Sequence, residues 1–446
     1  MDTTRKQPGI ARSVLTIAGN GNGISTTKLA AIGLERRYRK FLINEAMALL
    51  TRLQQLQPFE FSMPMVSAAA IPYDAQKNIF ELMKAGKTLL ADKARGFITR
   101  MKGSNGIPFE KCQSAYSVLK LQFNSLLDQF DIFADVVSQR GENETGIWVA
   151  GLDYLAKDAI STEGYILSPP PMICYLDRGH GAAIRRARTR LPGGDENPVA
   201  VIKIPRERMV ASGIGSSLVH EVGHQGSALL NLIPSIKPDL EEMSKRDPAH
   251  SESWKLLSRW ISEILSDYWS VSVLGISAST GLISVVSLPR YFVFRIVDDD
   301  PHPFPWIRVK ISVGFGKLVY PDDQWQRLER LWETMYPKKG LNAKLLQMVN
   351  SLEQIIPAFC KMIMEHQPES LKGKTLKDIF PTQERQPAQL RENYFLWKDK
   401  VDEWSKQRPS LVFAVVGQAR ADNTITPFAE NRLLTKALRH WALTNI

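Results

Sequence analysis

The chain has 446 residues, of which 44% are hydrophobic and 23% are charged, and its net charge is +11. This composition excludes disordered and collagen-like proteins, and the length allows two or three domains with a large buried core. The widely separated Cys112, Cys174 and Cys360 exclude a disulfide framework, a zinc ribbon and an iron–sulfur motif, and are typical of a reducing compartment. The positive charge is compatible with nucleic acid, an anionic membrane or acidic partners.

Neither a signal peptide nor a transmembrane helix is predicted. Residues 1–25 are rich in Gly, Ser, Thr and Asn, and they lack the apolar core that Sec export requires. We expect a cytoplasmic protein or one exported by a non-Sec route, with this flexible N-terminus as a delivery tag or a frayed end. The charge-free stretch Tyr268–Pro289 is long enough to span a bilayer, but its Ser and Gly content favours a buried helix–turn–helix.

Apolar residues recurring at intervals of three and four predict helices, and short apolar runs in the middle of the chain predict two strands. The predicted elements are helices over 28–56, 74–101, 109–138 and 147–159, strands over 172–176 and 199–204, a helix over 251–270 among the helices that follow Ser212, and helices over 341–446. The pattern predicts a mainly α fold with a small β-sheet, of the α+β class.

The most informative motif is His220-Glu221-Val222-Gly223-His224, an H-E-x-x-H sequence. Residues four apart share one face of a helix, so both imidazoles can face one metal ion while Glu221 lies beside it. Ser216 or Ser217 offers an N-cap for this helix. The alternative is a core helix with two incidental histidines, which the small total of 7 His makes the weaker interpretation.

A catalytic zinc site needs a third protein ligand and one open position. Glu263 and Asp267 lie four residues apart on an otherwise apolar helix, where buried carboxylates need a metal, a cation or strong hydrogen bonds. We expect Glu263 to be the third ligand and Asp267 to accept the free ring N–H of a ligating histidine. Competing ligands are ranked lower because they lie in or near a Pro-containing connection; they are Glu241, Glu242, His250 and Glu252.

HEVGH followed by Glu263 and Asp267 resembles the gluzincin metallopeptidases, the thermolysin-like clan. In that clan a second helix supplies a glutamate ligand and, four residues on, an aspartate that contacts a ligand. Residues 302–309 (HPFPWIRV) resemble the H-P-x-x-x-x-R-[IV] element of the minigluzincin branch, which includes HtpX-like and CAAX-prenyl-protease-like peptidases. The motifs together span about residues 199–309. The resemblance implies Zn²⁺ as cofactor and a protein or peptide substrate.

This resemblance implies a zincin-like metallopeptidase core flanked by helical regions. The expected organisation is a flexible N-terminus at 1–25, a helical N-terminal region at 26–145, the catalytic domain at 146–335 and a helical C-terminal region at 336–446. Two departures from the family stand out. The interval between His224 and Glu263 is wider than in thermolysin, so an insertion over the cleft is expected, and the membrane helices of the HtpX-like branch are missing.

The ligand set implies peptide hydrolysis by a zinc-bound water, with Glu221 as the general base. The developing oxyanion needs a donor besides zinc. His302 and Arg308 are favoured by the resemblance, and Tyr268 and Tyr291 are further candidates.

Two segments before the motif are open to more than one interpretation. The strand VAVIKI at residues 199–204 can be an edge strand that pairs with an extended substrate, as zincins have, or an ordinary sheet strand. The basic stretch contains His180 and the five residues Arg178, Arg185, Arg186, Arg188 and Arg190. A solvated basic face is favoured there, ahead of a rim that attracts acidic substrate. Nucleic acid is not expected, because no aromatic side chains are interleaved.

Three functions are therefore compatible with the sequence. The first is a zinc endopeptidase, and the second is a zinc amidohydrolase that cleaves amide bonds in a non-protein polymer. The third is a basic binding or scaffold protein whose H-E-x-x-H is not catalytic. The spacing of Glu263 and Asp267 favours an intact metal site and hence the peptidase.

Overall fold

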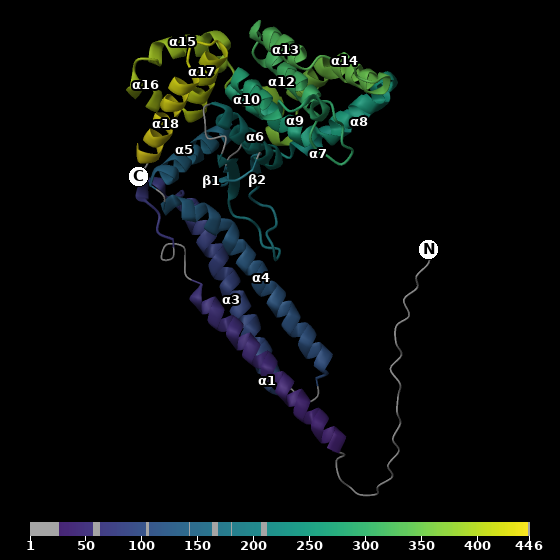
Figure 1. Cartoon of the computed structure of the whole chain (residues 1–446), viewed down its shortest axis with the longest axis vertical. Helices are drawn as coiled ribbons and strands as arrows, with labels where there is room; N and C mark the ends of the chain where they lie inside the picture. Colours follow the sequence, from purple (N-terminus) through teal and green to yellow (C-terminus); the bar gives the residue numbers. More distant parts are fainter. Residues whose placement is uncertain are drawn as a thin grey trace. The chain divides into compact units, whose positions relative to one another are not determined.

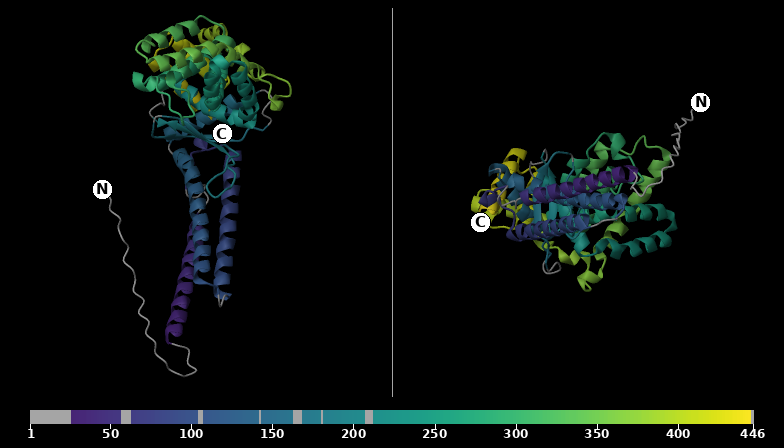
Figure 2. Two further views of the ribbon diagram at one scale, coloured as in Figure 1. Left: turned by 90° about the vertical axis from the view of Figure 1, so that its right-hand side faces the viewer. Right: turned by 90° about the horizontal axis from the view of Figure 1, so that it is seen from below.

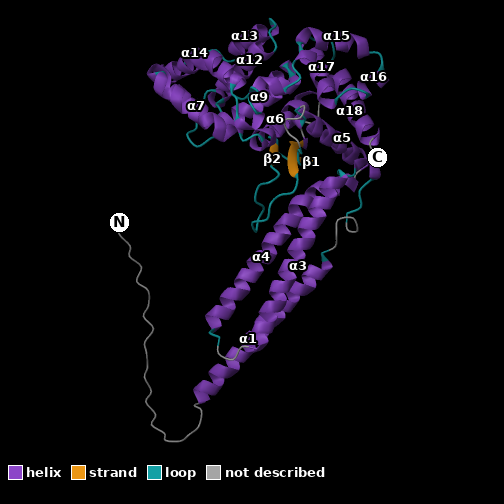
Figure 3. Cartoon of the chain, turned by 180° about the vertical axis from the view of Figure 1, so that it is seen from behind, coloured by secondary structure: helices purple, strands orange, loops and turns teal. Residues whose placement is uncertain are grey.

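The computed structural model describes residues 26–56, 63–103, 107–141, 143–162, 168–179, 181–206 and 212–444. The predicted flexible segment 1–25 and His180 lie outside these residues. The described part is mainly helical with one small three-stranded sheet, which confirms the α+β class (Figures 1 and 3). Among its helices, none combines the length and apolar character needed to cross a membrane.

The helices include nearly all those predicted. Up to residue 286 they are α1 (Thr26–Gln55), α3 (Tyr73–Gly103), α4 (Phe109–Ser138), α5 (Asn143–Ile160), α6 (Ser212–Leu229), α7 (Leu232–Arg246), α8 (Ser251–Arg259), α9 (Ile261–Leu274) and α10 (Ile276–Val286). After it they are α11 (Arg290–Val293), α12 (Pro305–Val319), α13 (Gln324–Met335), α14 (Ala343–Glu365), α15 (Pro387–Trp397), α16 (Val401–Ser405), α17 (Pro409–Ala421) and α18 (Pro427–Thr444).

The chain divides into two compact units, and the first consists of residues 1–55 and 90–121. Its described part is α1 with portions of α3 and α4, which lie side by side (Figures 1 and 2). Arg39 donates to the Ile107 carbonyl at 2.7 Å and to Glu35 at the same distance, and the Tyr38 ring lies 3.8 Å from that of Phe109. This unit contains no residue of the predicted site.

The second unit, residues 56–89 and 122–446, contains the sheet. The strand order is β1 (Met172–Asp177), β3 (Ala200–Pro205), β2 (Ala183–Arg185), with β1 parallel and β2 antiparallel to β3. The VAVIKI strand is therefore central, which agrees with the second of its two interpretations, an ordinary sheet strand. One of the two edge strands beside it is β2, a three-residue strand that was not predicted because its sequence, AIR, is short and lies within the arginine-rich stretch.

Helices α6 and α9 pack closely because glycines face the contact. A Cβ atom at Gly223 would lie 2.8 Å from Ser266 Cα and 2.9 Å from Trp269 Cβ, and one at Gly226 would lie 2.4 Å from the Trp269 ring. Such distances leave no room for a side chain. The glycine inside the HEVGH motif thus lets the helix that carries Glu263 approach the helix that carries the histidines.

The charge-free stretch forms the end of α9 and the whole of α10, which are buried and separated at Gly275. Gly275 has φ of +60°, a conformation that favours glycine. This confirms the predicted buried helix–turn–helix. The predicted helix over 251–270 is instead two helices, α8 and α9, which meet at Trp260.

The connection between the motif helix and α8 is helical rather than irregular. Helix α7 continues through Pro238, although proline has no N–H to donate to the preceding turn. Leu232, Ile236 and Leu240 recur every four residues and are buried, so burial of one face outweighs the missing hydrogen bond.

The C-terminal helices share the core of this unit, since one apolar cluster continues from α5 to α18. It therefore includes helices on both sides of the predicted boundary at residue 336. The α6 helix begins at Ser212, before the predicted caps Ser216 and Ser217. Glu430 of α18 accepts hydrogen bonds there from the Ser212 backbone N–H at 2.9 Å and from its hydroxyl at 2.6 Å.

Candidate metal centre

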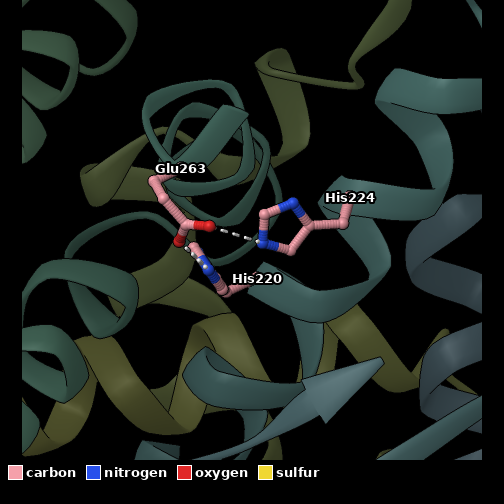
Figure 4. A group of neighbouring side chains, drawn as sticks. All are labelled: His220, His224 and Glu263. Carbon is pink, nitrogen blue, oxygen red and sulfur yellow. Dashed lines mark hydrogen bonds and ion pairs between the residues drawn. The ribbon is translucent and has the colours of Figure 1, made fainter. Parts of the chain in front are cut away.

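Two histidines of α6 and one glutamate of α9 converge in the second unit (Figure 4). The Nε2 atom of His220 lies 3.1 Å from Glu263 Oε2, and the Nε2 atom of His224 lies 3.3 Å from Glu263 Oε1. One ligand atom from each side chain falls within 4.8 Å of the other two. The structure thus brings together the three predicted metal ligands.

The donor set and spacing fit zinc. Zn–N and Zn–O bonds of about 2.1 Å in a tetrahedron place neighbouring ligand atoms about 3.4 Å apart. The two histidine–carboxylate separations are close to this value, and two imidazoles with one carboxylate are ligands that zinc accepts. His220, His224 and Glu263 can therefore hold such an ion without rearrangement of the helices.

Asp267, one turn after Glu263, orients the first histidine. Its Oδ1 lies 2.8 Å from His220 Nδ1, so Nδ1–H donates to the carboxylate and Nε2 faces Glu263. Burial by itself lowers the pKa of His220. The neighbouring carboxylates of Asp267 and Glu263 raise it by more than burial lowers it, so that the pKa is about 9. Without a metal ion, the cluster therefore favours a protonated His220, whose positive charge lies where that of the ion would lie.

Arg308 of α12 holds Asp267 from the other side. Its Nε donates to Oδ2 at 2.7 Å and its Nη2 to Oδ1 at 2.9 Å, a bidentate contact. Burial raises the pKa of Asp267, but Arg308 and His220 lower it more, to about 2. Asp267 therefore remains a carboxylate, and it can keep accepting the His220 N–H.

His224 has a weaker outer partner that the sequence analysis missed. Its Nδ1 lies 3.4 Å from the Ser262 hydroxyl, while its Nε2 faces Glu263. Ser262 directly precedes Glu263 in the sequence, and this adjacency was the only signal that could have identified it. Both histidines thus present the same nitrogen, Nε2, to the centre of the cluster.

A pocket of about 170 Å³ opens beside the cluster. His220, Glu221, Asp267, His302 and Arg308 lie on its wall. The remaining lining residues are small or apolar, and the sequence analysis did not place them at a pocket. They are Gly181, Ala182, Ser216, Ser217, Ser270, Ala278, Leu282, Val285 and Ser312. Glu221 thus borders the same space as the ligand His220, where a reacting group could approach both.

The candidate oxyanion donors are placed very differently. His302 is half-exposed at the pocket, with Nε2 3.3 Å from Glu263 Oε2 and Nδ1 2.7 Å from Asp300 Oδ1. Tyr268 is fully buried against Phe315 and Phe380, and Tyr291 is 70% exposed. Neither tyrosine is among the pocket residues, because Tyr268 faces the core and Tyr291 lies on the short helix α11. The pocket brings together only His302 and Arg308 of the four.

The four lower-ranked ligands lie outside the cluster, and three of them have other partners. His250 contacts Asp247 and Gln354, Glu252 pairs with Lys255 at 2.6 Å, and Glu242 pairs with Arg246. Glu241 is an exposed residue of α7. None of the four belongs to the group of described side chains that could hold a metal.

No protein-family model matches the chain, and neither a curated protein nor a solved structure matches it. The geometry of the cluster is therefore the basis on which a function is proposed.

Proposed function

We propose that this protein is a zinc-dependent metallopeptidase of the gluzincin type. The observation that carries the proposal is the convergence of His220, His224 and Glu263 at separations suited to zinc, with Glu221 on the adjoining pocket wall. A purely structural helix pair would have no need for two histidines and a buried carboxylate facing one point.

Zinc bound there would lower the pKa of a water molecule to about 7 and polarise a substrate carbonyl. Glu221 is outside the ligand group and is free to act as a base. It accepts the proton that the attacking water releases, and it passes that proton to the amine nitrogen as the C–N bond breaks. The peptide is thereby divided into a carboxylic acid and an amine, and Glu221 returns to its initial state.

Of the two remaining donor candidates, the contacts favour His302. The Nε and Nη2 atoms of Arg308 are engaged by Asp267, and Nη2 also lies 3.6 Å from Glu263 Oε2, so Arg308 orients the candidate ligands and is a positioning residue. His302 is half-exposed at the pocket and lies within 3.3 Å of Glu263. It can reach a carbonyl oxygen on which negative charge develops beside the cluster.

The experiment compares wild type with Glu221→Gln in two assays. Metal analysis should give about one zinc per chain for both, because Glu221 is not a ligand. Turnover should fall by roughly 10²–10⁴-fold in the variant, the usual contribution of a general base. Cleavage-site profiling of a proteome digest supplies the substrates. Identical profiles for the two proteins, or a wild type free of bound metal, would contradict the proposal.

A further inference from the structure

We propose that the preferred substrate is an acidic peptide, bound in extended form along β2, with Arg185 facing one of its carboxylates. This inference rests on the proposed peptidase function and specifies its substrate class. It assigns a role to the arginine-rich stretch, which the metal centre does not use.

The position of β2 is the first observation. Gly181 and Ala182, which immediately precede this strand, line the pocket beside His220 and Glu221. Within the described residues β2 pairs with β3 alone, so its outer side is an edge. An edge strand can add an extended peptide by main-chain hydrogen bonds, which would lead the peptide past the cluster.

The second observation is that the arginines around β2 have no acidic partner. In the part of the chain that the structure describes, no ion pair involves any of the five residues Arg178, Arg185, Arg186, Arg188 and Arg190. Other arginines of this unit are paired, for example Arg140 with Asp153 and Arg391 with Asp422. Unpaired arginines concentrated at one site attract a ligand of opposite charge.

The third observation is that the basic segment is fixed relative to the active-site helix. The backbone N–H of Ala187 donates to Gln225 Oε1 at 2.9 Å, and Gln225 directly follows His224. The buried Asn197 side chain donates to the Arg186 carbonyl at 3.0 Å. These contacts connect the strand end to α6, so the arginines keep a defined position along any peptide bound there.

Strand geometry predicts where the acidic residues should be. Arg185 follows Ala182 by three residues, and an extended chain advances about 3.3 Å per residue. Arg185 thus lies about 10 Å along the backbone from the pocket wall. We expect Glu or Asp about three residues from the cleaved bond, on the side of the peptide that lies along β2.

The test uses three fluorogenic peptides that share one uncharged central sequence and carry Glu, Gln or Lys at the third residue on each side of it. For wild type at about 50 mM salt, kcat/KM should fall from Glu to Gln to Lys, by roughly tenfold overall, and the differences should shrink at about 1 M salt. Arg185→Glu should reverse this order. The matched control, Arg327→Glu on the exposed face of α13, should keep it.

A second measurement separates this inference from the peptidase proposal. The same peptides carrying a fluorophore are titrated onto the Glu221→Gln protein, and binding is followed by anisotropy. If the peptides bind in the order of their charge but wild type does not cleave them, the acidic-peptide site is retained and the peptidase proposal is contradicted. Turnover that ignores peptide charge would overturn the inference and leave the peptidase intact. A single-stranded oligonucleotide that binds more tightly than the Glu peptide, through the same arginines, would also overturn it.

Discussion

The candidate metal centre and the residues that lead into β2 line the same pocket, yet the arginines of the two regions have very different surroundings. In the candidate metal centre, the Arg308 side chain is only 12% exposed and both carboxylate oxygens of Asp267 accept its N–H groups. On β2, Arg185 is exposed and forms no ion pair with the described residues. A buried charge needs internal partners because its desolvation is costly, whereas an exposed charge can remain hydrated until a ligand arrives.

Under the proposed function, the difference separates residues that orient the candidate metal ligands from residues that would select the substrate. The contacts from Arg308 through Asp267 to His220 orient a candidate ligand, so they form inside the folded chain. Arg185, the one arginine of β2, takes no part in those contacts. Substitutions in the two regions should therefore change different quantities.

Loss of Glu263 should give the largest effect. Glu263→Ala removes one of three ligands, so zinc affinity should fall by more than the roughly 10–100-fold expected for an outer partner. Titration with a competing chelator measures the affinity. The control is Glu252→Ala on α8, whose carboxylate pairs with Lys255 and lies outside the cluster. Unchanged zinc affinity in Glu263→Ala would show that the third ligand is another residue.

Loss of an arginine should distinguish the two regions through stability. Arg308→Leu leaves the Asp267 carboxylate buried without its bidentate partner, which should lower the free energy of unfolding by about 3–5 kcal/mol. The same substitution at the exposed Arg185 should change it by no more than about 0.5 kcal/mol. Urea denaturation measures both values. Equal losses of unfolding free energy in the two variants would contradict the expected difference between the partly buried Arg308 and the exposed Arg185.

The close packing of α6 and α9 is tested by Gly223→Ala. Its new Cβ meets Ser266 and Trp269 at under 3 Å, so the helices must separate, at a cost of about 1–3 kcal/mol. Zinc affinity should fall as well, although no ligand is removed. Gly213→Ala in the same helix is the control, because its Cβ meets nothing within 4 Å. If both variants bind zinc like wild type, the glycine is not required for the site.

The smallest expected effect within the centre belongs to Ser262→Ala. The hydroxyl lies 3.4 Å from His224 Nδ1, a long contact compared with the 2.8 Å between Asp267 and His220. Zinc affinity should therefore fall by less than the roughly 10–100-fold that a well-formed outer partner contributes. Chelator competition on Ser262→Ala and Asp267→Ala in parallel measures the order. A larger loss for the serine variant would contradict this ranking of the two partners.

Local patterns were sufficient for most helices and for the choice of the three residues that converge. The helix over 109–138 has the predicted bounds, since apolar spacing alone identifies a long amphipathic helix. His220 and His224 share a face because they are four residues apart on one helix. Glu263 and Asp267 could be inferred because carboxylates on an apolar helix need partners.

Other features depended on contacts that no local pattern encodes. Pro238 has no N–H to donate to the preceding turn, but burial of Leu232, Ile236 and Leu240 maintains α7. The start of α6 is set by Glu430, which is 218 residues away from Ser212. Tyr268 was a plausible donor by sequence position, yet its side of α9 faces the core.

The sequence by itself determined the α+β class, the α6 motif and the identity of the three residues that converge. These follow from helical periodicity and from the chemistry of side chains a few residues apart. Only the tertiary structure decided that β3 is central and β2 lies at an edge of the sheet. It also decided that Arg308 donates to both carboxylate oxygens of Asp267, and that Gly181 and Ala182 line the pocket. Strand order and contacts between distant elements depend on how whole surfaces pack, which local spacing does not specify.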